Sequence, residues 1–217
     1  MKLIVNMTLK KTLPILFILL FSFNSYANSD QSLQAREFIG KFCDKIIKIT
    51  QDKEISDISK IQEIINHIDI SVNAKWISRF VLGSNYRKMS EDQIAKFSKI
   101  YRLYMINTYS PKFTNYNSYG INVIDVEKMT RFYLVKTKFD IESSQKPINI
   151  DFRVKLFDDK FLIIDIIAEG ISLVETQRSE FGSTISTKGI DKFIEIMNDK
   201  LSKAIVKNEE GEIKSEK

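Results

Sequence analysis

Asp165 and Glu169 are the two side chains of this sequence best placed for acid–base chemistry. They stand four residues apart at the end of an apolar run, and a carboxylate in a pocket can act as a general base. Residues 161–167 are predicted as a strand, so the two carboxylates straddle its end and are not expected to share a face. Hydrogen-bonded structural roles near a turn are the simpler interpretation of both, and general-base catalysis by either one is the alternative.

Metal and nucleophile chemistry has few residues to draw on. His67 is the only histidine and Cys43 the only cysteine, so neither a His/Cys metal site nor a paired His/Cys nucleophile can be assembled. The seven glycines are scattered and form no phosphate-binding loop. Cys43 lies on the apolar stripe of a predicted helix, where burial is expected, and a redox or dimer-linking role is the alternative. His67 is expected to lie at the surface or to be hydrogen-bonded. We therefore expect no catalytic residue, no metal and no cofactor.

The first 27 residues have the pattern of a cleaved export signal. Three lysines precede a short apolar run and then small residues, in the order Lys2, Lys10 and Lys11, residues 13–23, and Ser25-Tyr26-Ala27. The apolar run is too short to span a bilayer as a folded helix. The pattern predicts cleavage after Ala27, and an uncleaved membrane anchor is the alternative. The residue directly after this position is Asn28 rather than a cysteine, so a lipoprotein anchor is not expected.

The charge of the chain changes once that segment is removed. The full sequence carries +5 at pH 7, and three of its lysines but none of its acids lie in residues 1–27, which leaves about +2. A nearly balanced exported chain is not expected to bind nucleic acid. Residues 28–206 are sufficient for one domain with a substantial core. Residues 207–217 are charged and lack aromatic side chains, so they are predicted to be disordered.

Apolar periodicity predicts helices at both ends of the chain and strands between them. The early helices are residues 32–50, 58–68 and 76–82, and a fourth that a Ser90/Gln93 capping box begins and Pro111 stops. An amphipathic segment after Gly170 and a last helix after Gly189 close the chain. Strand signals begin near Ile121 and continue through residues 131–141, 148–157 and 161–167, with turns at residues 145–147 and 158–159.

Alternation of polar and apolar residues with hairpin turns implies an antiparallel sheet with one solvated face. We expect an α+β fold, in which a curved antiparallel sheet of about four strands packs with N- and C-terminal helices around a hydrophobic cavity. The last strand, residues 161–167, is apolar on both faces, and Tyr and Phe together number 23. The extra apolar surface must meet helices, a partner or a ligand.

Five short motifs, taken in order, resemble the MlaC family, also called the toluene-tolerance auxiliary family. They are Arg79-Phe80-Val81-Leu82-Gly83, Tyr86-Arg87-Lys88-Met89-Ser90, Ile166-Ile167-Ala168-Glu169-Gly170-Ile171-Ser172-Leu173-Val174, Arg178-Ser179-Glu180-Phe181 and Thr187-Lys188-Gly189-Ile190-Asp191. The resemblance covers roughly residues 76–201. It implies a monomeric, periplasmic, non-enzymatic carrier with phospholipid as its cargo. It also implies two partners, an inner-membrane ABC transporter complex and an outer-membrane lipoprotein complex, and a role in outer-membrane lipid asymmetry and toluene tolerance.

The resemblance places the family's pocket-facing strand-to-helix junction on Ile167, Ile171 and Val174. The predicted helices and strands add further candidates for lipid contact, namely Phe80, Val81, Tyr101, Tyr104, Met105, Phe152 and Ile163. Arg87 and Lys88 are candidates for contact with a phosphate headgroup or an acidic partner, with simple solvation as the alternative. The competing function is an exported small-pocket enzyme of curved-sheet fold that uses Asp165 or Glu169 as its base.

Overall fold

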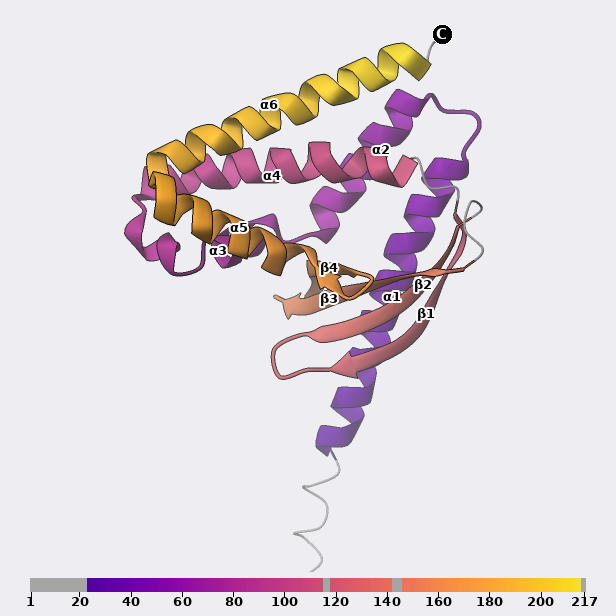
Figure 1. Cartoon of the computed structure of the whole chain (residues 1–217). Helices are drawn as coiled ribbons and strands as arrows, with labels where there is room; N and C mark the ends of the chain where they lie inside the picture. Colours follow the sequence, from indigo (N-terminus) through magenta and orange to yellow (C-terminus); the bar gives the residue numbers. More distant parts are fainter. Residues whose placement is uncertain (1–22, 115–117, 142–145, 216–217) are drawn as a thin grey trace, which may run out of the picture.

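The computed structural model describes residues 23–114, 118–141 and 146–215 of the chain, and it has the predicted order of helices, strands and helices (Figure 1). The helical elements are α1 (Phe23–Gln51), α2 (Asp57–Ser71), α3 (Ala74–Leu82), the 3-10 helix η1 (Gly83–Lys88), α4 (Glu91–Thr114), α5 (Leu173–Lys188) and α6 (Ile190–Ser215). The strands are β1 (Ser118–Lys128), β2 (Tyr133–Ile141), β3 (Ile148–Phe157), β4 (Lys160–Ala168) and β5 (Ile171–Ser172). The α+β prediction is confirmed.

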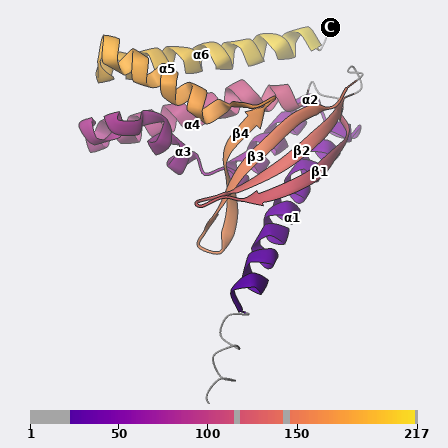
Figure 2. The same cartoon turned by 60° about the horizontal axis from the view of Figure 1, so that its bottom comes forward.

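The strands form one antiparallel sheet in the order β1-β2-β3-β4-β5, which curves strongly alongside α1 (Figures 1 and 2). The sheet has five strands rather than about four, because Ile171–Ser172 pairs back onto the end of β4. Strand β5 was not predicted because two residues are too few to show the alternation of polar and apolar side chains that indicates a strand. Glu169 and Gly170 make the reversal with positive φ angles of 47° and 80°, and such angles cost a glycine almost nothing.

An irregularity between β3 and β4 explains why β4 is apolar on both faces. Phe152 pairs with Ile166 but Val154 pairs with Ile163, so β4 has one extra residue between these pairs. The bulge redirects the side chains that follow it. Ile163 packs into the core between the sheet and α1, while β4 also contacts α3 and α5. The extra apolar surface of this strand therefore meets helices over part of its length.

Two apolar cores hold the molecule together. The first core joins α1 and α2 to the sheet, and its largest fully buried members include Ile39, Ile64 and Phe152. The second core joins α3, α4, α5 and α6 around an aromatic cluster that contains Phe97 and Phe181. Figure 1 shows this division, with α6 lying along α4 on one side of the molecule and α1 behind the sheet on the other. None of the helices in the described ranges is both long and apolar enough to cross a membrane.

Several predicted helix ends can be compared with the structure. The capping box is confirmed, since the Ser90 amide donates to Gln93 Oε1 at 3.0 Å and the Gln93 amide donates to Ser90 Oγ at 3.2 Å. The prediction that Pro111 stops the fourth helix is wrong, because α4 continues to Thr114. Proline removes one backbone hydrogen bond, and a helix already formed can continue past it with a bend.

The C-terminal end of the chain differs from its prediction, and the N-terminal end leaves its prediction untested. α6 runs to Ser215, through most of the segment predicted to be disordered. Extending an existing helix costs much less than starting one, and glutamate and lysine are good helix formers. The predicted export signal lies largely outside the described residues, and α1 begins at Phe23, within its last part. Cleavage after Ala27 stays a prediction.

Candidate functional site

A cavity of about 520 Å³ lies where the two cores face each other, since members of both cores line it. Its walls come from α1, α2, α3, α4, α5 and all five strands. The lining residues are Phe42, Ile46, Ile47, Thr50, Ile68, Val72, Ile77, Met105, Tyr109, Ile121, Phe139, Ile148, Ile150, Ile163, Asp165, Ile166, Ala168, Ile171, Leu173, Val174 and Thr176. The volume is within the usual range for a small-molecule site.

The lining is almost entirely apolar, and isoleucine dominates it. Four residues have polar side chains, namely Thr50, Tyr109, Asp165 and Thr176. The Thr50 hydroxyl donates to the Ile47 carbonyl at 2.9 Å, and the Thr176 hydroxyl donates to the Ser172 carbonyl at 2.7 Å. The hydroxyl protons of the two threonines are therefore committed to the backbone, and these walls present mainly hydrocarbon to a ligand.

Cross-strand pairing places the apolar part of the sheet's lining on one face, whereas Asp165, which alternates with Ile166 and pairs with Arg153, lies on the other face. Ile121 pairs with Phe139, and Phe139 pairs with Ile148, so three neighbouring strands present one apolar row. On the next strands Ile150 pairs with Ala168 in the same way. Directly opposite residues in an antiparallel sheet share a face, so this row forms a continuous wall of the cavity.

The opposite wall includes the last turns of α1. Phe42 and Ile46 belong to the first core, whereas Ile47 is partly exposed and lies one position further round the helix. All three line the cavity. The apolar stripe of α1 is therefore wider than the surface that the sheet covers, and the excess faces the cavity.

Ile171 marks the mouth of the cavity. Its side chain lines the cavity and is also 68% exposed, among the most exposed of the large apolar side chains in the described structure. It follows the Glu169–Gly170 turn and pairs only with Ala168, at the edge of the sheet. The next residues turn inward, because Leu173 and Val174 also line the cavity and Val174 is 2% exposed.

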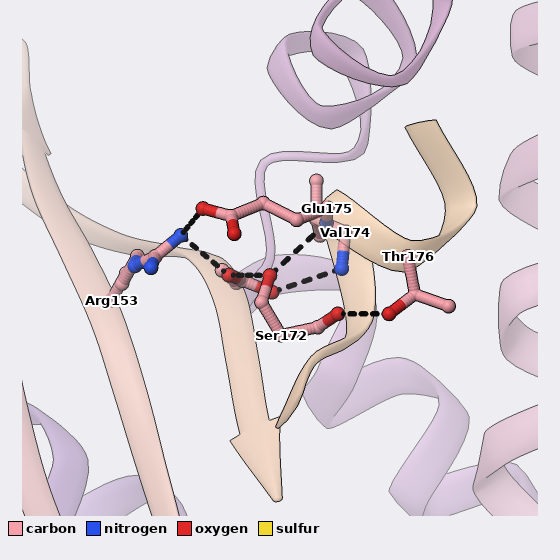
Figure 3. A network of polar contacts seen from close by, with 6 residues as sticks. Arg153, Ser172, Val174, Glu175 and Thr176 are labelled. Atoms are coloured by element: carbon pink, nitrogen blue, oxygen red, sulfur yellow. Dashed lines mark hydrogen bonds and ion pairs between the residues drawn. The ribbon is translucent and has the colours of Figure 1, made fainter. Parts of the chain in front are cut away.

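A polar network lies beside this mouth, where Arg153, Ser172, Val174 and Glu175 converge (Figure 3). At its centre is the carboxylate of Asp165, which accepts hydrogen bonds from Ser172 Oγ at 2.6 Å and from the Val174 amide at 3.1 Å. Arg153 Nη1 lies 3.0 Å from Asp165 Oδ2 and 2.6 Å from Glu175 Oε1. The network therefore joins β3, β4 and the first turn of α5.

Burial governs the ionisation of the polar side chains near the cavity. It raises the pKa of Asp165, and the hydrogen bonds from Ser172 and Val174, with the charge of Arg153, oppose that rise. Burial also raises the pKa of Tyr109 to about 12. Tyr109 accepts a hydrogen bond from Gln177 Nε2 at 3.3 Å, and Gln177 in turn accepts one from Tyr101. Tyr109 is thus a neutral hydroxyl at neutral pH.

Four of the predicted lipid-contact residues line the cavity together: Ile171, Val174, Met105 and Ile163. They come from β5, α5, α4 and β4, which are distant in the sequence. Contact of these side chains with a lipid stays a prediction.

Ile167 and Phe152 do not line the cavity, although both were expected to. Ile167 lies between Ile166 and Ala168, which do line it, so its side chain points to the other face of the sheet. Phe152 is 1% exposed and packs edge-on against Phe42 at 6.0 Å between ring centroids. It shares a face of the sheet with the lining residues Ile150 and Ile166, but it packs against Phe42 in the first core instead of reaching the cavity.

The remaining aromatic and helical candidates belong to the second core or its edge. Phe80 stacks on Trp76 with ring centroids 5.2 Å apart, and Val81 is fully buried. Tyr101 stacks on Phe97, and Tyr104 packs against the same core. None of these four predicted residues lines the cavity, because α4 reaches it only at Met105 and Tyr109 and α3 reaches it only at Ile77.

Arg87 and Lys88 are exposed at the end of η1 and are not lining residues.

Glu169 lies in the reversal after β4, and its carboxylate accepts a hydrogen bond from the Asn149 amide. Cys43 is buried, as expected. His67 Nε2 donates to the Phe42 carbonyl at 3.1 Å, and burial lowers its pKa. In the described ranges, no group of three or more His, Cys, Asp and Glu side chains could hold a metal ion.

Sequence reasoning missed most of the cavity wall. More than half of the missed residues come from α1, α2 and the first three strands, among them Ile47, Ile68, Ile121, Phe139 and Ile150, and the others include Ile77, Ile166 and Leu173. A signal was present in α1, where adjacent isoleucines at 46 and 47 make the apolar stripe unusually wide. No comparable signal exists in the strands, where the same alternation serves a core and a cavity equally well.

Comparison with known proteins gives a consistent result. The model of the family described as "MlaC protein" matches residues 41–199. The intermembrane phospholipid transport system binding protein MlaC of Haemophilus influenzae is 23% identical over 168 residues, which cover 75% of this chain and 78% of that protein. A solved structure of the phospholipid-binding protein from Ralstonia solanacearum in complex with a phospholipid superposes with a TM-score of 0.69. That match has 16% sequence identity and covers 79% of this chain and 98% of the other, so it establishes the likeness of fold.

Proposed function

The chain belongs to the MlaC protein family, and we propose that it binds a phospholipid in the cavity between its two cores and carries it between membranes. The observation that carries this proposal is the cavity itself, with its hydrocarbon walls and an exposed apolar residue at its mouth. The relatives named for phospholipid transport and phospholipid binding support the same ligand class.

The energetics of acyl chains suit a carrier with such walls. Removing one methylene group from water is worth about 0.8 kcal/mol, so a lipid would not leave the cavity for water alone. A bilayer buries the same methylenes, and transfer from membrane to cavity is therefore nearly balanced. A carrier needs this balance, because small differences in free energy then decide whether lipid is loaded or delivered.

The route of the carrier forms the finer part of the proposal. We place the protein in the periplasm, between an outer-membrane lipoprotein complex and an inner-membrane ABC transporter, where it contributes to outer-membrane lipid asymmetry. Because Arg87 and Lys88 are exposed and lie outside the cavity lining, we assign them to contact with an acidic partner surface rather than with the headgroup.

The competing enzymatic role for Asp165 is not favoured by its surroundings. Its two oxygens accept hydrogen bonds from Ser172 and Val174 and an ion pair from Arg153. A general base needs a free lone pair aimed at the substrate. These contacts instead tie the carboxylate to the neighbouring elements.

Native mass spectrometry of the exported protein tests the proposal. We expect the folded chain to carry a non-covalent adduct with the mass of a phospholipid, and solvent extraction should release that lipid for identification. A folded, exported protein that is consistently free of lipid, and that takes none from phospholipid vesicles, would refute the proposal.

A further inference from the structure

Asp165 places a carboxylate in a wall that is otherwise almost entirely hydrocarbon. Its side chain is 3% exposed and lines the cavity. A buried charge is costly unless hydrogen bonds and an opposite charge compensate for it. Asp165 has both kinds of partner, and the positions of these partners show which segments its carboxylate connects.

Two of its donors belong to the segment that forms the mouth. Ser172 and Val174 flank Leu173, and the segment begins with the exposed Ile171. Backbone pairing holds this segment to β4 at only two positions, Ile167 with Ser172 and Ala168 with Ile171. The side chain of Asp165 therefore supplies a large share of the polar contacts that fix the mouth to the sheet.

The network also reaches from the cavity wall to the surface. Arg153 Nη1 bridges Asp165 and Glu175, and the side chains of these three residues are 24%, 3% and 56% exposed in that order. Glu175 lies in the first turn of α5, where its amide donates to Ser172 Oγ at 3.0 Å. A change of charge at Glu175 is thus connected through Arg153 to the carboxylate in the wall.

We infer that Asp165 is a positioning residue for cargo release, acting with Arg153 and Glu175 as a latch on the mouth segment 171–174. The inference rests on the proposed function, because it concerns how a bound lipid leaves. An acyl chain that passes the mouth must displace Ile171 and its neighbours, and the latch opposes that displacement. Weakening the latch speeds release and leaves the apolar walls, which hold the cargo, unchanged.

The experiment measures transfer of a fluorescent phosphatidylethanolamine from the loaded full chain to vesicles of phosphatidylcholine. Asp165→Asn keeps the shape of the side chain and removes its charge, and we expect transfer about tenfold faster than in the wild type. That factor corresponds to about 1.4 kcal/mol at the barrier. Glu175→Gln removes only the outer ion pair and should give a smaller acceleration, about threefold.

Two control variants separate a latch from a general loss of stability. Asp140→Asn neutralises an exposed carboxylate on β2, and it should transfer lipid at the wild-type rate. Ile185→Val weakens the second core, where Ile185 is 7% exposed, and it should lower the melting temperature without changing the transfer rate. If Asp165→Asn does not fold, the lipid-transfer rates of Glu175→Gln and Arg153→Lys test the inference in its place.

Unchanged or slower lipid transfer by lipid-loaded Asp165→Asn and Glu175→Gln, compared with the wild type, would overturn the inference. So would an equal acceleration in Ile185→Val at a matched loss of stability, since the effect would then be structural. A wild-type protein that takes up no phospholipid would instead overturn the proposed function, and this outcome is visible before any variant is made.

Discussion

Ile171 is the residue where cavity and solvent meet, and a charge there should act on the ligand more than on the fold. Ile171→Glu puts a carboxylate at a position that is 68% exposed, so the empty protein can keep it hydrated. A bound acyl chain would strip part of that water, at a cost in free energy. We expect a folded variant whose lipid occupancy is about tenfold lower, a change of about 1.4 kcal/mol, measured by native mass spectrometry.

Ile124 provides a matched control for this substitution. It is 52% exposed but does not line the cavity, so Ile124→Glu should fold and keep its lipid. Equal lipid loss in both variants would mean that surface charge, rather than the mouth, controls occupancy.

Asp165 should make stability depend on pH in a definite direction. Burial raises its pKa above the ordinary value of 3.8, so the folded protein holds the proton more tightly than the unfolded chain does. This contribution to stability is fully present below pH 3.8 and is lost as the pH rises through the raised pKa. Asp165→Asn cannot titrate, so the stability of the wild type relative to the variant should fall over that window.

Urea denaturation of both proteins from about pH 3.5 to pH 7 measures this difference in the free energy of unfolding. A difference that stays constant across the range, or that grows with pH, would show that Asp165 is more easily ionised in the folded protein than its burial implies.

At the scale of elements, α4 contributes side chains to both the second core and the cavity. The Tyr101 hydroxyl donates to Gln177, and both side chains are buried, so Tyr101→Phe leaves a buried acceptor unpaired and should cost about 1–3 kcal/mol of stability. The lipid occupancy of Tyr101→Phe should not change.

Met105→Gln places an amide in the cavity wall, and it should lower the lipid occupancy of the protein more than the free energy of unfolding.

The two variants of α4 are each other's controls, with chemical denaturation and native mass spectrometry as the two measurements. Lipid loss in Tyr101→Phe at normal loading of Met105→Gln would restore the sequence-based assignment of Tyr101 to the cavity.

The same elements show what the sequence could and could not reveal. Apolar periodicity located the helices and strands because a core-facing stripe repeats every three to four residues and a core-facing strand alternates. It could not reveal the bulge in β4, since an extra residue leaves a run such as Ile163-Ile164 looking simply apolar. Ile166 rather than Ile167 lines the cavity on the far side of this bulge, although the family resemblance had indicated Ile167, and contact of either side chain with lipid stays a prediction.

Of the residues that line the cavity, the family resemblance indicated Ile171 and Val174, and the predicted helix and strand indicated Met105 and Ile163. Ile171 and Val174 also follow a glycine turn at the end of a strand, which is visible in the sequence and agrees with the position that the resemblance implies. Phe139, Ile150 and Ile68 became lining residues through packing between distant elements. Their own sequence surroundings are those of ordinary core residues.

At the scale of the whole molecule, the folded domain should not depend on the leader once export is complete. Cleavage after Ala27 would leave α1 with all of its first-core residues, which begin at Ala35. We expect the exported protein to begin at Asn28 and to keep its full stability. N-terminal sequencing of the exported product checks this, and a membrane-bound product that retains Lys2 would contradict it.

The cavity exists because two separately packed cores meet without merging, and the central claim is that acyl chains fill the space between them. A phospholipid with a nitroxide on its acyl chain tests this directly through the isoleucine methyl signals of the loaded protein. The predicted result is strong broadening for Ile46, Ile68 and Ile166 on the cavity wall and much weaker broadening for Ile185 and Ile194 in the second core. Equal broadening of both sets, or broadening confined to the second core, would contradict the account.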